Sequence, residues 1–131
     1  MEGTLAGLFT DVNWLAVIVG AVVAYALGAV WYSQKMFGAI WMKGIGHAGD
    51  NKGTPMLPMI AQAGATFLFA LVIGITETTD ALLFAILITL TIAAFIKASG
   101  LFAGKSHAAI GVESGYVIAM GVILLFTHVV L

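Results

Sequence analysis

Four stretches of this sequence are long enough and apolar enough to cross a membrane as helices. They are Val12–Tyr32, Met56–Ile75, Ala81–Phe102 and Glu113–Leu131. About 20 apolar residues, each rising 1.5 Å, cover the roughly 30 Å of hydrocarbon in a bilayer. Only 8% of the 131 residues are charged and the mean hydropathy is +1.12, more apolar surface than a water-soluble fold of this length can bury. We therefore predict an all-α polytopic membrane protein, a four-helix bundle forming one domain over residues 1–131.

The residue types that are missing exclude several functions. There is no cysteine and no arginine, and the net charge is −1. These values argue against disulfides, thiol chemistry and nucleic-acid binding. The three histidines, His47, His107 and His128, are not at the i, i+4 spacing of a helical metal site, so we expect no metal and no cofactor. No set of side chains resembles a catalytic group, and we do not expect an enzyme.

Charge predicts the orientation in the membrane. An even number of spans puts both termini on one side, and that side carries the acidic residues Glu2, Asp11, Glu77 and Asp80. The other side holds all five lysines: Lys35, Lys43, Lys52, Lys97 and Lys105. By the positive-inside rule, both termini lie outside, and the loops 33–55 and 103–112 are cytoplasmic.

Aromatic residues mark the predicted membrane boundaries. Trp14 lies at the outer edge of the first span, Trp31 and Tyr32 lie at its inner edge, and Trp41 follows nearby. Such rings favour the interface of water and lipid, so we interpret all four as interface anchors. On a helical wheel the residues after the first span separate into an apolar and a basic face, which predicts a short amphipathic interfacial helix or, alternatively, an extension of the first span. Its apolar residues are Met36, Phe37, Ile40, Trp41 and Ile45.

Small residues at spacings of four predict helix packing. Gly20, Ala24 and Gly28 form one such ridge on the first span, and Gly111, Gly115 and Ala119 form another at the fourth. Small side chains let helix backbones approach closely in lipid. One ridge can pack within the molecule and the other against a partner subunit, or both can be internal. The short connection 76–80 also predicts that the second and third spans pack side by side.

Lys97 is the one charge inside an otherwise apolar and small-residue run, "TLTIAAFIKASGLFAG". Counted along the helices, Lys97 and Glu113 fall at nearly the same depth near the inner boundary. We therefore expect them to pair there, with the lysine as a membrane-edge anchor. Gln62, Tyr25 and Tyr116 fall in the same half of the membrane. This inner-leaflet cluster is either a small polar pocket open to the cytoplasm or polar contacts that hold helices together.

Several motifs resemble a family of small bacterial membrane proteins, domain of unknown function family 1761. They are "NWLAV" at Asn13–Val17, "GAVWYS" at Gly28–Ser33, "FGAIWM" at Phe37–Met42 and "ESGY" at Glu113–Tyr116. The similarity is strongest over residues 1–42. Members often carry His after the last Tyr, where this chain has Val117. The resemblance implies a four-helix fold in a bacterial cytoplasmic (inner) membrane and brings no known activity.

Two hypotheses about function follow. The first is a non-catalytic helix-packing component of the lipid bilayer, acting as a homo-oligomer or as an accessory subunit of a membrane complex. The second is a small-solute transporter or channel with a polar pocket open to the cytoplasm. A small-residue ridge that faces lipid favours the first hypothesis, and a cavity between the helices favours the second.

Overall fold

The computed structural model describes residues 7, 9–33, 35–45 and 56–131 of the chain. Its helices are α2 (Trp14–Trp31), α3 (Gly38–Ile45), α4 (Met56–Glu77), α5 (Leu82–Phe102) and α6 (His107–Val130). All but the short α3 are long and apolar enough to cross a membrane. This confirms the predicted all-α fold with four membrane-spanning helices and a short helix after the first, and the described residues contain no strand.

Polar side chains set the start of two helices. The Asn13 side chain accepts a hydrogen bond from the backbone N–H of Ala16 at 3.1 Å, and Ser106 accepts one from Ala109 at 3.1 Å. These bonds satisfy backbone donors that a helix start leaves free. Because of the Ser106 cap, α6 begins at His107, so the predicted start at Glu113 is wrong. That prediction counted only the residues needed to cross the membrane, whereas α6 continues beyond that length.

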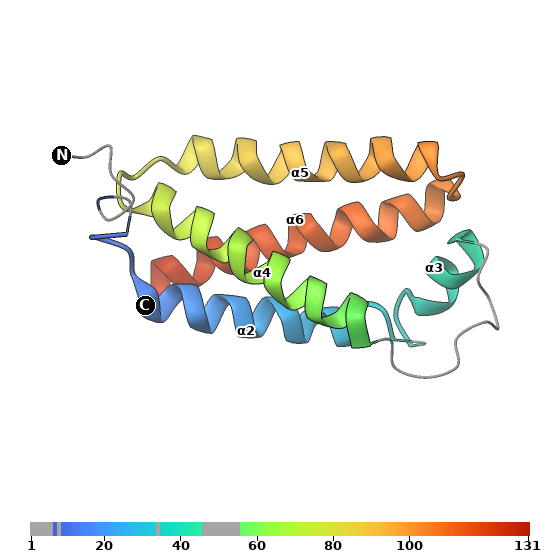
Figure 1. Ribbon diagram of the computed structural model, residues 1–131, viewed down its shortest axis with the longest axis horizontal. Helices are drawn as coiled ribbons and strands as arrows, with labels where there is room; N and C mark the ends of the chain where they lie inside the picture. The colour runs from blue at the N-terminus through green and yellow to red at the C-terminus, as the bar shows by residue number, and fades with distance from the viewer. Residues whose placement is uncertain (1–6, 8, 34, 46–55) are drawn as a thin grey trace.

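α6 is the central helix of the arrangement. It packs most extensively against α5 and α2, and it also contacts α3 and α4. In Figure 1 it runs behind α4, in the space between α5 and α2. Leu124 of α6 is fully buried, and Val117 and Met120 are nearly so. The core therefore follows one face of α6, and α2, α3 and α5 each make their largest interface with it.

α4 and α5 are joined by a tight turn but separate beyond it. Asp80 in this turn has a φ of 54°, a left-handed conformation that aspartate tolerates better than most residues. Figure 1 shows α4 diverging from α5 along its length. α4 packs mainly on α2 and contacts α5 little, so the predicted side-by-side packing of these two spans holds only near the turn. A short connection constrains the ends of two helices and leaves their crossing angle free.

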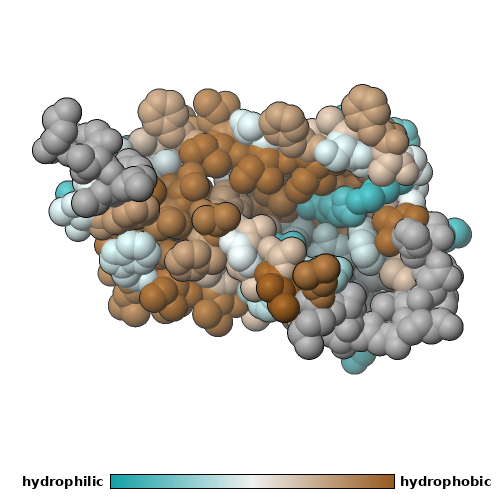
Figure 2. Space-filling model, in the orientation of Figure 1, coloured by the Kyte–Doolittle hydropathy of each residue, from teal (hydrophilic) through white to brown (hydrophobic). Residues whose placement is uncertain are grey.

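The outer surface is largely apolar, as expected for helices surrounded by lipid. Figure 2 shows hydrophobic residues over most of the visible face, with hydrophilic residues interrupting it toward the end where α3 lies. Leu83 is 80% exposed and Phe102 95% exposed. Exposed apolar area of this extent is unfavourable in water and is solvated by hydrocarbon chains in a bilayer.

The small-residue ridge of α2 faces α6. A methyl group added at Gly20 would lie 2.8 Å from the side chains of Leu124 and Thr127, and one added at Gly28 would lie 2.6 Å from the Tyr116 hydroxyl. Ala24, between them, is fully buried. This ridge is therefore an internal packing face that allows close contact between the two helices.

The second predicted ridge is not one packing face. A methyl group at Gly111 would meet nothing within 4 Å, whereas one at Gly115 would lie 3.2 Å from the Trp31 ring. Ala119 is half-buried. The close approach of α5 and α6 uses other glycines: Gly100 faces Ile110, and Gly121 faces Thr89.

Candidate functional site

α3 folds back onto the beginning of α6. The Trp41 indole N–H donates a hydrogen bond to Glu113 Oε2 at 2.7 Å, and the Ser106 backbone N–H donates one to the Gly44 carbonyl at 2.9 Å. Gly44 lies so close to Ser106 and Ala109 that a side chain there would overlap them. α3 is therefore a docked element, and its position brings Trp41 to the end of the helix assembly at which α2 ends and α6 begins. We call this the α3 end.

Glu113 is paired with Lys105. The lysine Nζ lies 3.1 Å from Glu113 Oε1 and 2.8 Å from Oε2. Both side chains are mostly buried, with 29% and 15% exposed. The predicted pairing of Glu113 with Lys97 is therefore wrong. The Lys97 side chain is exposed on α5, and within the described part of the chain it forms no ion pair or hydrogen bond.

Aromatic side chains gather beside this carboxylate. The Tyr32 ring stands edge-on to the Trp41 ring, with centroids 5.2 Å apart, and edge-on to the Tyr116 ring at 5.6 Å. The Trp31 indole donates to the Val112 carbonyl at 2.9 Å, and the Tyr116 hydroxyl donates to the Ala24 carbonyl at 2.7 Å. Three of the residues predicted as interface anchors thus make contacts between helices, while Trp14 is exposed at the other end.

These groups line a cleft of about 490 Å³ at the α3 end, which we call the end cleft. It is lined by Tyr25, Gly28, Ala29, Tyr32, Trp41, Pro58, Met59, Gln62, Ile96, Glu113, Tyr116, Val117 and Met120. Contributions come from all five helices and from the C-cap residue of α2. The volume lies within the range of small-molecule sites in proteins.

Four of the five residues predicted as a polar cluster line the end cleft: Tyr25, Gln62, Glu113 and Tyr116. Lys97 is not among them. Tyr32 and Trp41 also line it, although the sequence suggested only boundary positions for them. Trp41 reaches the cleft because α3 folds back, and a helical-wheel pattern in α3 carries no information about that direction.

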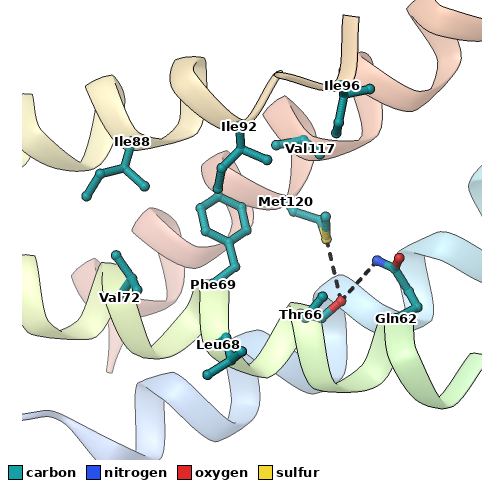
Figure 3. Close-up of a pocket in the computed structure, with 11 residues that line it drawn as sticks. Gln62, Thr66, Leu68, Phe69, Val72, Ile88, Ile92, Ile96, Val117 and Met120 are labelled. Carbon is teal, nitrogen blue, oxygen red and sulfur yellow. Dashed lines mark hydrogen bonds between the residues drawn. The ribbon is translucent and has the colours of Figure 1, made fainter. Parts of the chain in front are cut away.

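A second, apolar cleft of about 380 Å³ continues from the first, and we call it the side cleft. It shares Gln62, Ile96, Val117 and Met120 with the end cleft and is otherwise lined by Ala65, Thr66, Leu68, Phe69, Val72, Ile88 and Ile92. Figure 3 shows the α5 isoleucines and Phe69 of α4 pointing into the same space. Leu68 and Val72 at its rim are exposed, so the side cleft opens between α4 and α5, toward the lipid of a surrounding bilayer.

Most polar atoms in the end cleft are already bonded within the protein. The Tyr25 hydroxyl donates to the Met59 carbonyl at 3.1 Å, and the Gln62 amide donates to Thr66 Oγ1 at 3.2 Å, as Figure 3 shows. Among the described lining residues, the remaining hydrogen-bonding capacity comprises the Glu113 carboxylate and the Gln62 carbonyl oxygen as acceptors, and the Tyr32 hydroxyl and the second N–H of the Gln62 amide as donors. These free groups, together with the aromatic rings, can contact a small ligand in the cleft.

The comparisons with known proteins give one match. The model of the family described as "Protein of unknown function (DUF1761)" matches residues 15–129 of this chain. No curated protein and no solved structure matches the chain.

Proposed function

Given that the chain belongs to the DUF1761 family of proteins of unknown function, we propose from its geometry that it binds a small solute in the end cleft and transports it. The proposal corresponds to the second hypothesis drawn from the sequence, a transporter or channel with its polar pocket at the lysine-bearing end.

One observation carries this proposal: polar residues far apart in the sequence converge on one cleft. Tyr25 comes from α2, Gln62 from α4, and Glu113 from α6. Their hydrogen bonds and the docked α3 hold the cleft walls in place. Helices that only pack against each other in lipid need no such cleft, and the cost of polar groups at this depth favours a functional role.

The weak contact between α4 and α5 supports movement as well as binding. α4 is held mainly by α2 and makes few contacts with α5 and α6, so α4 can shift against α5 at little cost in buried surface while the α2–α6 interface stays intact. Transport requires a second state in which the site opens elsewhere, and this boundary is the place where such a change disrupts the fewest contacts. We further propose that the α3 end faces the cytoplasm of a bacterial inner membrane, because Lys35, Lys43 and Lys105 lie there.

A homo-oligomer or an accessory subunit remains a second candidate role. The observation that favours it is the open space at Gly111, on an exposed part of α6. Close approach of another helix there is sterically allowed. The α2 ridge supports this role less, because it is already used inside the molecule.

Cysteine accessibility tests the proposed site, since the natural chain has no cysteine. In nanodiscs, a Gln62→Cys variant should react with a small, charged, water-soluble thiol reagent that enters the end cleft. Ile118→Cys is the matched control, because Ile118 is exposed on α6 at similar depth but does not line the cleft. If Gln62→Cys reacts no faster than Ile118→Cys, while Lys43→Cys on α3 reacts readily, lipid fills the cleft and solute binding there is wrong.

A further inference from the structure

The end cleft combines one carboxylate with a group of aromatic rings. Glu113 lies among Tyr32, Trp41 and Tyr116, and Tyr25 lines the same space. Aromatic faces attract cations within about 6 Å of the ring centre, and the attraction grows when the site excludes water. A carboxylate beside such rings adds a direct electrostatic attraction for a positive group.

The carboxylate keeps capacity for a further contact although Lys105 is bound to it. An ionised carboxylate has about four acceptor positions. Trp41 and Lys105 both donate to Oε2, and among the described residues Oε1 receives a hydrogen bond from Lys105 alone. Lys105 itself does not line the end cleft; it faces a neighbouring groove together with Phe95 and Ser99. Among the described residues no lysine lines the end cleft, so the described side chains that face a ligand there carry one negative charge and no positive one.

The side cleft adds an apolar extension to this charged site. Its contribution from α5 consists of Ile88, Ile92 and Ile96, and α4 adds Phe69 across the gap (Figure 3). Ile96 belongs to both clefts, so the two are continuous. A molecule that fits both has a compact polar head and an apolar tail, and it can enter sideways from the bilayer.

We infer that the solute is a lipophilic organic cation, with its ammonium group held by Glu113 and the aromatic rings of the end cleft and its apolar tail in the side cleft. This inference rests on the proposed function and specifies its substrate class. An anion would meet no positive side chain among the described residues of the lining. A polyhydroxy solute would find few free donors among the described residues, because the Tyr25 and Tyr116 hydroxyls and one N–H of the Gln62 amide are already bonded, which leaves the Tyr32 hydroxyl and the second Gln62 N–H.

Equilibrium dialysis of labelled decyltrimethylammonium against the purified full chain tests this. Neutral maltoside micelles are the medium, since they contain no ammonium group, and empty micelles give the baseline. The matched probe is the neutral analogue in which carbon replaces the ammonium nitrogen. We expect the cation to bind about tenfold more tightly than the neutral analogue, because the quaternary ammonium, which has no N–H to donate, gains Coulomb attraction to Glu113 and cation–π attraction to the rings.

Two substitutions should change binding in opposite directions. Glu113→Gln should weaken cation binding about tenfold and leave the neutral analogue unaffected. Lys105→Gln should strengthen cation binding several-fold, because it frees Glu113 from its competing partner. A general loss of structure would instead weaken cation binding in both variants. Glu77→Gln, the same chemical change at the last residue of α4, is the control and should bind as the natural chain does.

Equal binding of the cation and the neutral analogue, unchanged by Glu113→Gln, would overturn the inference while leaving solute binding in the end cleft intact. Absence of binding by either probe would also overturn it, and the Gln62→Cys reaction then decides the proposed function separately. Excess phosphatidylethanolamine should not displace the probe. Complete displacement would show that a phospholipid head group occupies the site and would contradict a non-lipid cation.

Discussion

Trp41 and Glu113 are separated by 72 positions in the sequence and joined by a hydrogen bond of 2.7 Å between the indole Nε1 and the carboxylate Oε2. The bond ties the short helix α3 to the central helix α6 at the point where Lys105 also reaches the carboxylate. It therefore links the position of α3 to the charge state and geometry of the end cleft.

Trp41→Phe should loosen α3 selectively. The phenyl ring keeps most of the contact area but cannot donate to Glu113, and a hydrogen bond to a charged group contributes about 1.5–3 kcal/mol. We expect amide hydrogen exchange in residues 38–45 to become roughly tenfold faster, with little change in α5. Trp14→Phe, at the opposite end of the assembly, should leave α3 unchanged. Unaltered exchange in Trp41→Phe would mean that the Gly44–Ser106 contact alone holds the helix.

Lys105 and Glu113 should show strong coupling in stability. Lys105→Met or Glu113→Gln alone leaves the partner less well satisfied in a mostly buried place, and each should lower the thermal midpoint. The double variant should lose about 1 kcal/mol less unfolding free energy than the two single variants added together, because neither residue then keeps an unpaired charge. Lys97→Met combined with Glu113→Gln is the control cycle and should be additive. Coupling in the Lys97 cycle, with additivity in the Lys105 cycle, would contradict the observed ion pair.

Gly28 and Gly111 should respond oppositely to the same substitution. A methyl group at Gly28 would overlap the Tyr116 hydroxyl and disturb its hydrogen bond to the Ala24 carbonyl. Gly28→Ala should therefore lower the free energy of unfolding by about 1–3 kcal/mol. Gly111→Ala meets open space in the structure and should be neutral or slightly stabilising. Thermal unfolding in nanodiscs measures both. A destabilised Gly111→Ala would point instead to a second subunit packed at that position.

Single cysteines at Thr79 and Lys43 report the orientation of the chain. Both positions are exposed, one in the turn between α4 and α5 and the other on α3. If the lysine-bearing end is cytoplasmic, an impermeant thiol reagent added to intact cells should label Thr79→Cys and leave Lys43→Cys unlabelled until the cells are opened. The reverse pattern would invert the proposed topology.

The sequence predicted the helices well because membrane spans are a local property. Length and hydropathy along the chain are enough to locate them, and α2, α4 and α5 begin and end within a few residues of the prediction. The small-residue ridge of α2 could be predicted for the same reason, because all of its residues lie on one helix. Its partner was not visible, because the sequence does not show which helix faces Gly20 and Gly28.

The sequence predicted the wrong partner for Glu113 because equal depth in the membrane does not show whether two side chains face each other. Lys97 has a suitable depth, but the rotation of α5 turns it outward, while Ile96 beside it faces the cleft. Lys105 lies in the connection between α5 and α6, as predicted, and the turn at Gly104 together with the start of α6 at His107 brings its side chain to the carboxylate. Rotation and turn geometry depend on tertiary contacts, which the spacing of charges alone does not reveal.

The central position of α6 has a consequence for how the protein is made. Translation releases α2, α4 and α5 before α6, so the first three helices enter the bilayer before the helix that holds them together exists. Until then, Gly20 and Gly28 on α2 and Gly100 on α5 present bare backbone to lipid or to the insertion machinery. The α2–α4 contact can form before α6 exists, but α5 is held mainly by α6, so a chain stalled before residue 107 leaves α5 largely unpacked and exposed to membrane proteases.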